Sequence, residues 1–285
     1  MQITRTVAHV EAATKAVVGV HKVNRALPVR HLKQISPFIF IDHMEPFEIK
    51  KGEKIMRIDP HPHAGFEVVT YLLNGKFFHR DSQGNEQIAE AGDINWMTSG
   101  KGIIHSEGPI NEMAETGGTV SLMQTWINLP ANKKFIDPSF RHYAGSNLPL
   151  VSTDAAELKV LIGSYGAVTS PITTHTAMYY YHIKMKAGQV FSYAVDAKHT
   201  AGIYVIDGSL KILNHTTDKG TVVEFNNDGD AVAVKSLTDV EFIAFGGEPI
   251  NEPLVSYGPF VMNDFKEIQQ AIHDYESGKM GVLEY

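Results

Sequence analysis

Two pairs of candidate metal ligands stand out in this chain of 285 residues. His61 and His63 are two residues apart, and His105 and Glu107 repeat that spacing about forty residues later. Side chains two residues apart on a β-strand lie on the same face, so each pair can point to one place inside a barrel. Three neutral imidazoles and one carboxylate suit a first-row divalent ion and leave coordination positions open for water, dioxygen or substrate. The two pairs together predict a metal site.

Other side chains near these pairs compete for a place in the site or assist it. Glu67 has the strand parity to face the same point as the first two histidines, so five candidates compete for four places. His79 follows the Asn74-Gly75 turn and either orients a ligand through a hydrogen bond or stabilises the strand edge. Trp96 and Met97 either contact a planar substrate over the metal or pack in the core. Spacing leaves each of these alternatives open.

The composition excludes several classes of protein. The chain is 43% hydrophobic and 20% charged, as soluble globular proteins are. Its formal net charge of -7 argues against direct binding to nucleic acid or to an anionic membrane surface, both of which need clustered Lys and Arg. The absence of Cys excludes disulfides, thiolate metal ligands and Cys nucleophiles. The sequence shows no signal peptide and no membrane-spanning run, so we expect a cytoplasmic protein, or a nuclear one in a eukaryote.

The local patterns predict strands almost throughout. Short runs rich in Val, Ile, Phe, Tyr and Thr are separated by turns such as Asn74-Gly75 and Asp207-Gly208, which is typical of an all-β sandwich or barrel. Helical periodicity occurs only near the end, where apolar residues repeat at spacings of three and four after the capping candidates Asn263 and Asp264. We expect one amphipathic helix there, ending at Gly278 and packing on its own domain.

An internal repeat divides the chain in two. The polar segment 130–149 is interpreted as a connection, and on either side of it residues 70–76 and 203–209 share one pattern of strand, turn and Gly. Residues 91–93 and 228–230 give a second match in the same order. Two β domains of like topology follow, with predicted bounds 1–135 and 136–285 and the helix in the second.

The second half is expected to bind no metal. Aligning the repeats puts other residue types at the positions of the ligand candidates, and the histidines of this half are scattered without a His-x-His pair. The aligned positions are Ala194, Asp196 and Thr200 for the first motif and the neighbourhood of Phe242 and Ala244 for the second.

The two ligand pairs resemble the paired motifs of the cupin superfamily, in which His-x-His-x-x-x-Glu ends one strand and a Gly-led strand delivers another His. Along almost its whole length the chain further resembles the pirin family, whose typical stretches occur here in order. The matching stretches are Ser36–His43, His61–Glu67, His79–Gly84, Gly92–Thr98, Gly102–Glu107, Gln124–Pro130 and Tyr257–Asn263.

The resemblance implies a fold and a ligand set. The fold is all-β, with two cupin barrels of the double-stranded β-helix or jelly-roll type in tandem and a short C-terminal α-helix. Only the N-terminal barrel keeps a metal, usually iron, and carried over to this sequence its ligands are His61, His63, His105 and Glu107. In pirins the later Glu is the ligand, which leaves Glu67 as a nearby carboxylate. Iron(II) is the expected ion, with manganese, zinc, nickel or copper as alternatives.

The resemblance also implies a function. We expect a quercetinase-type dioxygenase that opens a small planar phenolic substrate such as a flavonol, in which Glu107 takes the proton of the bound hydroxyl. One alternative is an iron-dependent, redox-sensing regulatory protein that binds a protein partner. A lesser alternative is a cupin isomerase that uses the site without redox chemistry.

Overall fold

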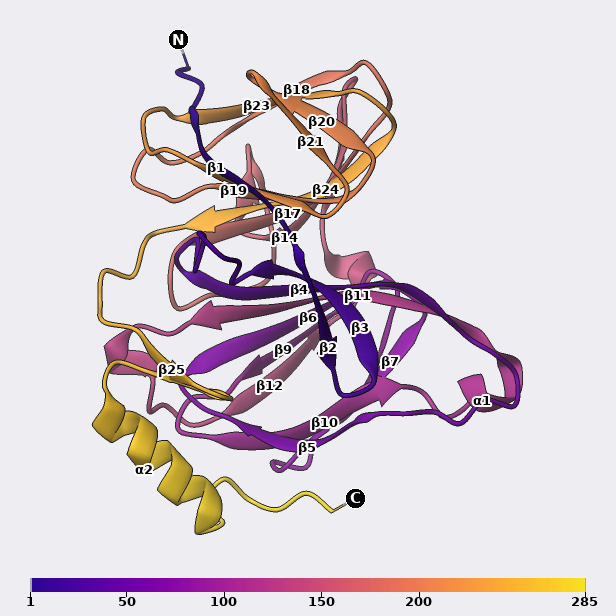
Figure 1. Cartoon of the computed structure of the whole chain (residues 1–285), viewed down its shortest axis with the longest axis vertical. Coiled ribbons are helices and arrows are strands. Elements are labelled where there is room, and N and C mark those ends of the chain that lie inside the picture. Colours follow the sequence, from indigo (N-terminus) through magenta and orange to yellow (C-terminus); the bar gives the residue numbers. More distant parts are fainter. Residues whose placement is uncertain (1, 285) are drawn as a thin grey trace. The chain divides into compact units, whose positions relative to one another are not determined.

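The computed structural model describes residues 2–284, most of which lie in β-strands (Figure 1). The chain divides into two compact units that exchange segments along the sequence. The unit here called the N-barrel contains residues 15–24, 40–146 and those from 251 onward. The unit called the C-barrel contains residues up to 14, 25–39 and 147–250. Two cupin domains and one C-terminal helix confirm the predicted fold class.

The N-barrel is built from a seven-stranded and a four-stranded sheet. The order of the larger sheet is β12 (Ser139–Tyr143), β9 (Ile94–Thr98), β6 (Phe66–Asn74), β11 (Gly118–Asn128), β4 (Phe38–Ile49), β3 (His21–Leu27) and β2 (Thr14–Val18). The order of the smaller sheet is β5 (Ile58–His63), β10 (Ile103–Pro109), β7 (Lys76–Asp81) and β8 (Glu86–Glu90). The remaining elements are the short helix α1 (Met113–Thr116), the 3-10 turns η1 (Ala131–Lys133) and η2 (Gly145–Asn147), the ribbon of β25 (Val255–Tyr257) and β26 (Phe260–Met262), and helix α2 (Phe265–Glu276).

The C-barrel repeats this arrangement of two sheets. The order of its larger sheet is β1 (Val7–Ala12), β22 (Thr221–Phe225), β19 (Gly202–Asp207), β24 (Val240–Gly247), β17 (Met178–Met185), β14 (Glu157–Ile162) and β13 (Leu150–Ser152). The order of its smaller sheet is β18 (Val190–Ala194), β23 (Ala231–Ser236), β20 (Ser209–Ile212) and β21 (His215–Asp218). A small ribbon joins β15 (Ser164–Tyr165) to β16 (Val168–Thr169).

The strand orders show which parts of the repeat correspond. The β6–β7 turn at Asn74-Gly75 matches the β19–β20 turn at Asp207-Gly208, as the sequence predicted. The second predicted match is wrong, because residues 91–93 join β8 to β9 whereas residues 228–230 join β22 to β23. Consequently the counterpart of β10 is β23, and the region of Phe242 and Ala244 lies instead on β24, which corresponds to β11.

The exchanged segments depart from the expected bounds 1–135 and 136–285. Strand β1 belongs to the C-barrel because it pairs with β22, more than 200 residues away along the chain. Helix α2 belongs to the N-barrel, where Ile268 and Ala271 are buried with Ala64 and Ile104. Pairing over such a sequence distance leaves no local signal, so the bounds could not be found from periodicity.

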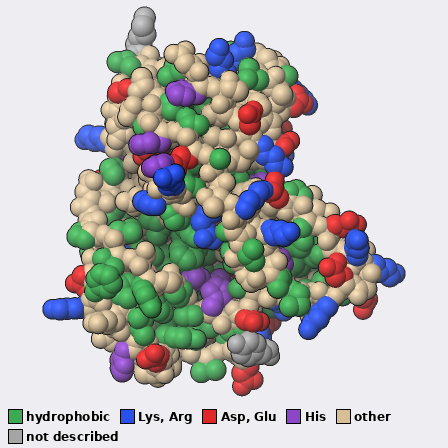
Figure 2. All heavy atoms as spheres, viewed as in Figure 1, with side chains coloured by type: hydrophobic (Ala, Val, Ile, Leu, Met, Phe, Trp, Pro, Cys, Tyr) green, Lys and Arg blue, Asp and Glu red, His purple; other side chains and the backbone are tan. Residues whose placement is uncertain are grey.

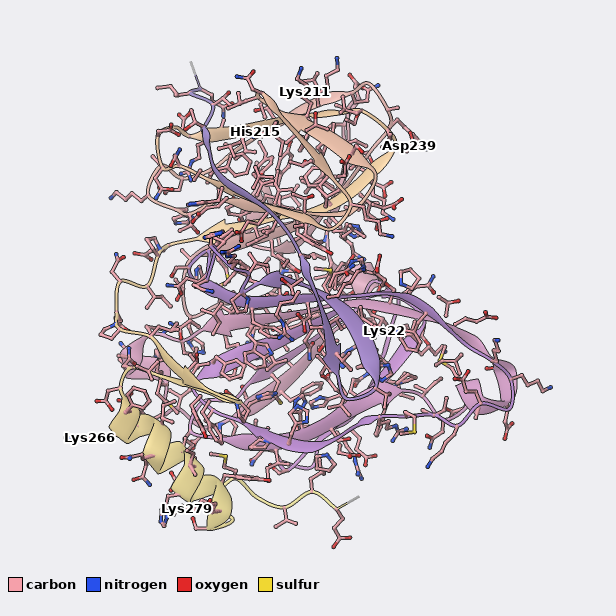
Figure 3. All side chains as sticks on the ribbon, viewed as in Figure 1. Lys22, Lys211, His215, Asp239, Lys266 and Lys279 are labelled. Atoms are coloured by element: carbon pink, nitrogen blue, oxygen red, sulfur yellow. The ribbon has the colours of Figure 1, made fainter. Side chains whose placement is uncertain are left out.

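Helix α2 forms where the sequence predicts it. The carboxylate of its N-cap residue, Asp264, accepts a hydrogen bond from the Glu267 amide at 2.9 Å, and the chain turns at Gly278 with a φ of 78°. Lys266 and Lys279 mark the two ends of this helix in Figure 3, and Lys279 pairs with Asp274 at 2.6 Å. Among the described residues, no helix is long and apolar enough to cross a membrane.

The segment 130–149 is more than a connection. Residues 139–143 form β12, which pairs with β9 at the edge of the N-barrel's larger sheet. Lys134 is fully buried, and its Nζ donates to the oxygens of Gly65, Asn128 and Val261 at 2.9, 2.7 and 3.1 Å. The polar composition of this segment therefore concealed a buried cation that links three parts of the N-barrel.

Candidate metal centre

Three of the predicted ligands form one cluster in the N-barrel. Strands β5 and β10 pair antiparallel with His61 opposite His105, so the two strands bring their histidines together. The ring centroids lie 4.8 Å apart for His61 and His63, 4.3 Å for His61 and His105, and 4.9 Å for His63 and His105. One ligand atom from each of the three lies within 4.8 Å of the others, which is close enough for a single ion to contact all three.

Backbone carbonyls set the orientation of two of these rings. Nδ1 of His61 donates to the carbonyl of Asp59 at 2.8 Å, and Nδ1 of His63 donates to the carbonyl of Pro259 at 3.4 Å. Because a carbonyl can only accept, both hydrogens lie on Nδ1 and each Nε2 keeps its lone pair. Metal-binding histidines characteristically have such a partner on the nitrogen that does not face the metal.

The side chain of His105 gives the most direct indication that a ligand-binding partner, such as a metal ion, belongs at this site. Its side chain is 1% exposed, and neither Nδ1 nor Nε2 has a hydrogen-bond partner within the described chain. A buried polar group without a partner costs about 1–3 kcal/mol, so an imidazole is rarely left in this state. An ion bound among the three histidines would use one of these nitrogens, and the donor set fits such an ion.

The electrostatics keep the cluster neutral. Burial lowers the pKa of His63 and of His105 well below the ordinary value for His, and the neighbouring imidazoles lower both further. Burial also lowers the pKa of His61. Neutral imidazole is the form that binds a metal, so the site is prepared to accept one without first losing protons.

Glu107 lies beside this cluster but faces other partners. Asp59 and Pro60 on β5 oppose the single residue Ser106 on β10, which makes a β-bulge. The pairing of β10 with β5 therefore shifts between His105, which lies opposite His61, and Glu107, which lies opposite Ile58. The carboxylate accepts hydrogen bonds from Gln124 Nε2 at 2.6 Å and from Thr70 Oγ1 at 3.5 Å. Its ligand oxygen groups with His79 and His105, all three within 4.8 Å of one another. Burial raises the pKa of Glu107 to about 7, against the effect of both hydrogen bonds.

Glu67 is buried and hydrogen-bonded to two neighbouring side chains. Its Oε1 accepts hydrogen bonds from Trp96 Nε1 at 3.0 Å and from Thr98 Oγ1 at 2.8 Å, and the side chain is 1% exposed. It belongs to neither group of ligand atoms that could hold an ion. Trp96 and Met97 are buried at 1% and 2%, which is consistent with packing in the core.

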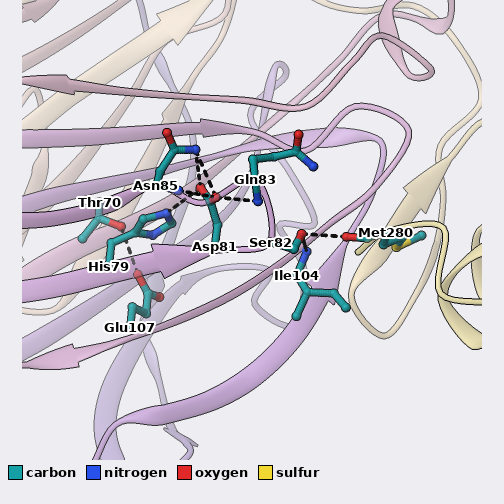
Figure 4. A network of polar contacts seen from close by, with 9 residues as sticks. All are labelled: Thr70, His79, Asp81, Ser82, Gln83, Asn85, Ile104, Glu107 and Met280. Carbon is teal, nitrogen blue, oxygen red and sulfur yellow. Dashed lines mark hydrogen bonds and ion pairs between the residues drawn. The ribbon is translucent and has the colours of Figure 1, made fainter. Parts of the chain in front are cut away.

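His79 is fixed by an acidic turn. Its Nε2 lies 3.1 Å from Oδ2 of Asp81, whose carboxylate also accepts from the Gln83 amide and from Asn85 (Figure 4). The imidazole stacks on Phe140 with centroids 4.2 Å apart, and its backbone pairs with that of Glu107 across the sheet. His79 is therefore a rigid neighbour of the predicted carboxylate ligand. Sequence reasoning assigned no role to Gln124 and Thr70, although Gln124 belongs to a family-like stretch.

Aromatic rings adjoin the cluster. Trp126 stacks on Phe40 and lies tilted against Phe66, with ring centroids 4.4 and 4.3 Å apart, and it meets His63 edge to face at a centroid distance of 5.1 Å. Phe40 and Trp126 are partly exposed. Figure 2 shows histidine side chains in a hollow of the face drawn, with hydrophobic side chains along much of its border. The surroundings of the cluster thus suit a flat apolar molecule.

The described part of the C-barrel holds no group of ligand atoms with this geometry. On the strands that correspond to β5 and β10, the buried cross-strand pairs are Val232 with Tyr193 and Val234 with Phe191. His182 is buried as well, but its Nε2 lies 2.7 Å from Glu241. The expectation that this half binds no metal stays a prediction.

Known proteins with similar sequences cover almost the whole chain. The model of the pirin family matches residues 20–127, and the model of the pirin C-terminal cupin domain matches residues 180–281. Human pirin is 32% identical over 273 residues, which are 91% of this chain and 88% of the human protein. A Pseudomonas aeruginosa protein named "Putative quercetin 2,3-dioxygenase PA2418" is 33% identical over 268 residues, 91% of this chain and 94% of that protein.

Solved structures give the same result. The crystal structure of quercetin 2,3-dioxygenase from Acinetobacter baumannii is 28% identical, covers 99% of this chain and all of its own, and superposes with a TM-score of 0.94. The nickel(II) complex of the bacterial pirin YhhW from Escherichia coli is 20% identical over 85% of this chain and 99% of its own, with a TM-score of 0.65, and shares the fold. On the evidence of both domain models and of these relatives, the chain belongs to the pirin family.

Proposed function

We propose that the N-barrel holds one divalent ion, preferably iron(II), through His61, His63, His105 and Glu107, and that the chain uses it to open flavonols with dioxygen. The observation that carries the proposal is His105, a buried imidazole with two nitrogens that lack partners, set between two other histidines. An ion at this point would take the lone pairs that the structure leaves unused.

Glu107 completes the proposed ligand set by a change of partner. The carboxylate already groups with His105, but it now accepts hydrogen bonds from Gln124 and Thr70. A rotation of the side chain would exchange these bonds for the ion. Glu67 is the less suitable carboxylate, because it belongs to neither group of ligand atoms that lie within 4.8 Å of one another, whereas Glu107 belongs to one.

A bound divalent ion supplies Lewis acidity to the substrate hydroxyl and, in the case of iron(II), redox access to dioxygen. The protein's own residues do the rest. The aromatic stack of Phe40, Phe66 and Trp126 would hold the flat rings beside His63, and Glu107 would accept the proton of the flavonol hydroxyl. The rings of Phe66 and Trp126 beside His63 would limit the access of water to the reacting atoms.

The choice of a flavonol has two sources of support. The Pseudomonas and Acinetobacter relatives are named for quercetin 2,3-dioxygenation, and the aromatic stack offers a surface for a polycyclic phenol. A non-redox sugar isomerase would need polar contacts around the substrate, and an aromatic border suits it less well. The expected cytoplasmic location stays a prediction.

The experiment is a comparison of metal forms. Protein freed of metal is reloaded anaerobically with iron(II), manganese, nickel, copper or zinc, and the loss of quercetin absorbance is followed together with oxygen uptake. We expect equal consumption of quercetin and oxygen by the iron form and none by the metal-free form. Full activity without metal would contradict the proposal. Bound iron with no turnover of flavonols or catechols would favour a regulatory role instead.

Trp126→Leu tests the placement of the substrate. Loss of the indole should raise KM for quercetin by roughly tenfold, because about 1–1.5 kcal/mol of aromatic stacking disappears. Metal content should stay at the level of the unaltered protein, since Trp126 offers no ligand. An unchanged KM would remove the aromatic stack from the proposal.

A further inference from the structure

The segment Pro259–Gly281, here called the C-terminal strap, contacts both strands that carry the candidate ligands. We propose that the C-terminal strap positions His63 and His105 and thereby sets how firmly the site retains its ion. The proposal rests on the metal site proposed above. It adds that residues remote in sequence, and not ligands themselves, hold the ligands in place.

At β5 the strap contacts a ligand directly. The carbonyl of Pro259 accepts from Nδ1 of His63, and it also accepts from the amide of the next residue, Ala64, at 3.4 Å. The amide of Val261 donates in turn to the Ala64 carbonyl at 3.0 Å. One turn of the strap therefore fixes the imidazole of His63 and the backbone that follows it.

Lys134 fastens the same contact from the interior. Its buried ammonium donates to the carbonyls of Gly65 and Val261 and to the side-chain oxygen of Asn128, so three donors meet three acceptors. A Cβ at Gly65 would lie 1.9 Å from the Val261 carbonyl oxygen, so the two chains approach as closely as Gly allows. Strand β5 and the strap are thus joined on both sides of Ala64.

At β10 the strap acts through Ser82. The Ser82 hydroxyl donates to the carbonyl of Met280 at 2.6 Å and accepts from the amide of Ile104 at 3.1 Å (Figure 4). The Ser82 amide returns a bond to the Ile104 carbonyl at 2.8 Å. Ile104 directly precedes His105, so the backbone that presents this ligand is connected to the strap by one hydroxyl group.

Apolar packing completes the connection. Ala64 from the β5 side and Ile104 from β10 share one buried cluster with residues of the strap, namely Phe260, Met262, Ile268, Ala271 and Met280. A Cβ at Gly102 would come within 2.6 Å of the Met280 side chain, so the strap lies against the turn that leads into β10. Displacing Met280 would therefore loosen the strand that carries His105 as well as uncover the cluster.

The test compares two ways of releasing the strap with a matched control. Ser82→Ala removes the link to Met280, and a chain ending at Lys279 removes Met280 itself. Ser121→Ala is the control, because Ser121 also donates from a buried hydroxyl to a carbonyl, that of Met44, but it lies on β11 away from the ligands. We expect both strap variants to lose iron(II) or nickel(II) to a chelator about tenfold faster than the unaltered protein. The control should release the ion at the unaltered rate, even where its melting temperature falls equally.

A second measurement needs no metal. In the metal-free protein, amide hydrogen exchange of residues 102–107 should be faster in both strap variants than in Ser121→Ala, and that of residues 61–66 should be faster in the shortened chain. Unchanged exchange in these segments, or unchanged ion release from a protein that binds ions normally, would overturn the role of the strap. Failure of the metal site itself would look different, because the unaltered protein and His105→Ala would then bind ions equally poorly while the exchange experiment still reported on the strap.

Discussion

The two barrels share one strand topology but carry different side chains on the corresponding pair of strands. In the N-barrel, β5 and β10 bring His61 opposite His105, whereas the corresponding strands β18 and β23 of the C-barrel pair Tyr193 with Val232 and Phe191 with Val234. The C-barrel positions belong to a continuous hydrophobic core. The C-barrel thus fills this point with apolar side chains, whereas the N-barrel gives up apolar packing there and holds three imidazoles.

The largest expected difference between the barrels lies in metal binding. His105→Ala should lower the affinity for iron(II) or nickel(II) by more than about 100-fold, because the loss of an outer partner alone costs about 10–100-fold. His182→Ala in the C-barrel is the matched control, since it also removes a buried histidine, and it should leave affinity unchanged. Competition with a chelator and metal analysis measure both. Normal metal content in His105→Ala would break the comparison.

A second pair of variants sharpens the choice of carboxylate within the N-barrel. Glu107→Gln should weaken metal affinity by about 10–100-fold, since an amide is a poorer ligand than a carboxylate. Glu67→Gln should change it by less than about twofold, because an amide oxygen can still accept from Trp96 and Thr98. The same chelator competition applies to both. A larger loss from Glu67→Gln would reverse the assignment.

The metal-free N-barrel should gain stability when it is made more like the C-barrel. His105→Leu replaces an imidazole that lacks partners by an apolar side chain. We therefore expect the free energy of unfolding of the metal-free variant to be about 1 kcal/mol higher than that of the metal-free unaltered protein. Added metal should stabilise the unaltered protein and leave this variant unaffected. Thermal and urea unfolding with and without metal check both statements. A less stable metal-free variant would show that His105 packs well without an ion.

The smallest expected effect concerns an ion-pair candidate of the C-barrel. The hydrogen bond from His182 lowers the pKa of Glu241 to about 2, while burial lowers the pKa of His182, so at neutral pH a neutral imidazole donates to a carboxylate. A carboxyl group whose pKa is lowered in the folded state stabilises that state at pH values above the carboxyl's ordinary pKa. This stabilisation is lost as the pH falls toward about 2. On acidification, the free energy of unfolding of Glu241→Gln should therefore fall less than that of the unaltered protein. The difference should be about 1 kcal/mol at most, because the carboxylate is partly exposed. Urea unfolding between pH 5 and 2 measures it, and parallel curves would count against the pair.

Strand parity made the histidine cluster predictable, whereas its supports were not. His61 and His63 had to share a face once their segment was a strand, and the turn residues fixed the class of fold. The hydrogen bonds of Glu107 to Gln124 and Thr70 join it to two other strands, and no spacing rule reveals such partners. Lys134 looked like a surface residue of a polar segment and is buried. Contacts of this kind join residues distant in sequence, and one sequence carries no direct record of them.

The exchange of segments between the barrels also determines at which stage of synthesis all parts of the N-barrel are present. During synthesis His61, His63 and His105 leave the ribosome long before the residues from 251 onward, and the N-barrel contains both sets. Until the residues from 251 onward emerge, the Pro259 carbonyl and the rest of the strap cannot pack against the strands that carry the candidate ligands. If the proposed site binds an ion, its firm retention would require the residues from 251 onward, and a nascent N-terminal half would present its imidazoles without the Pro259 carbonyl.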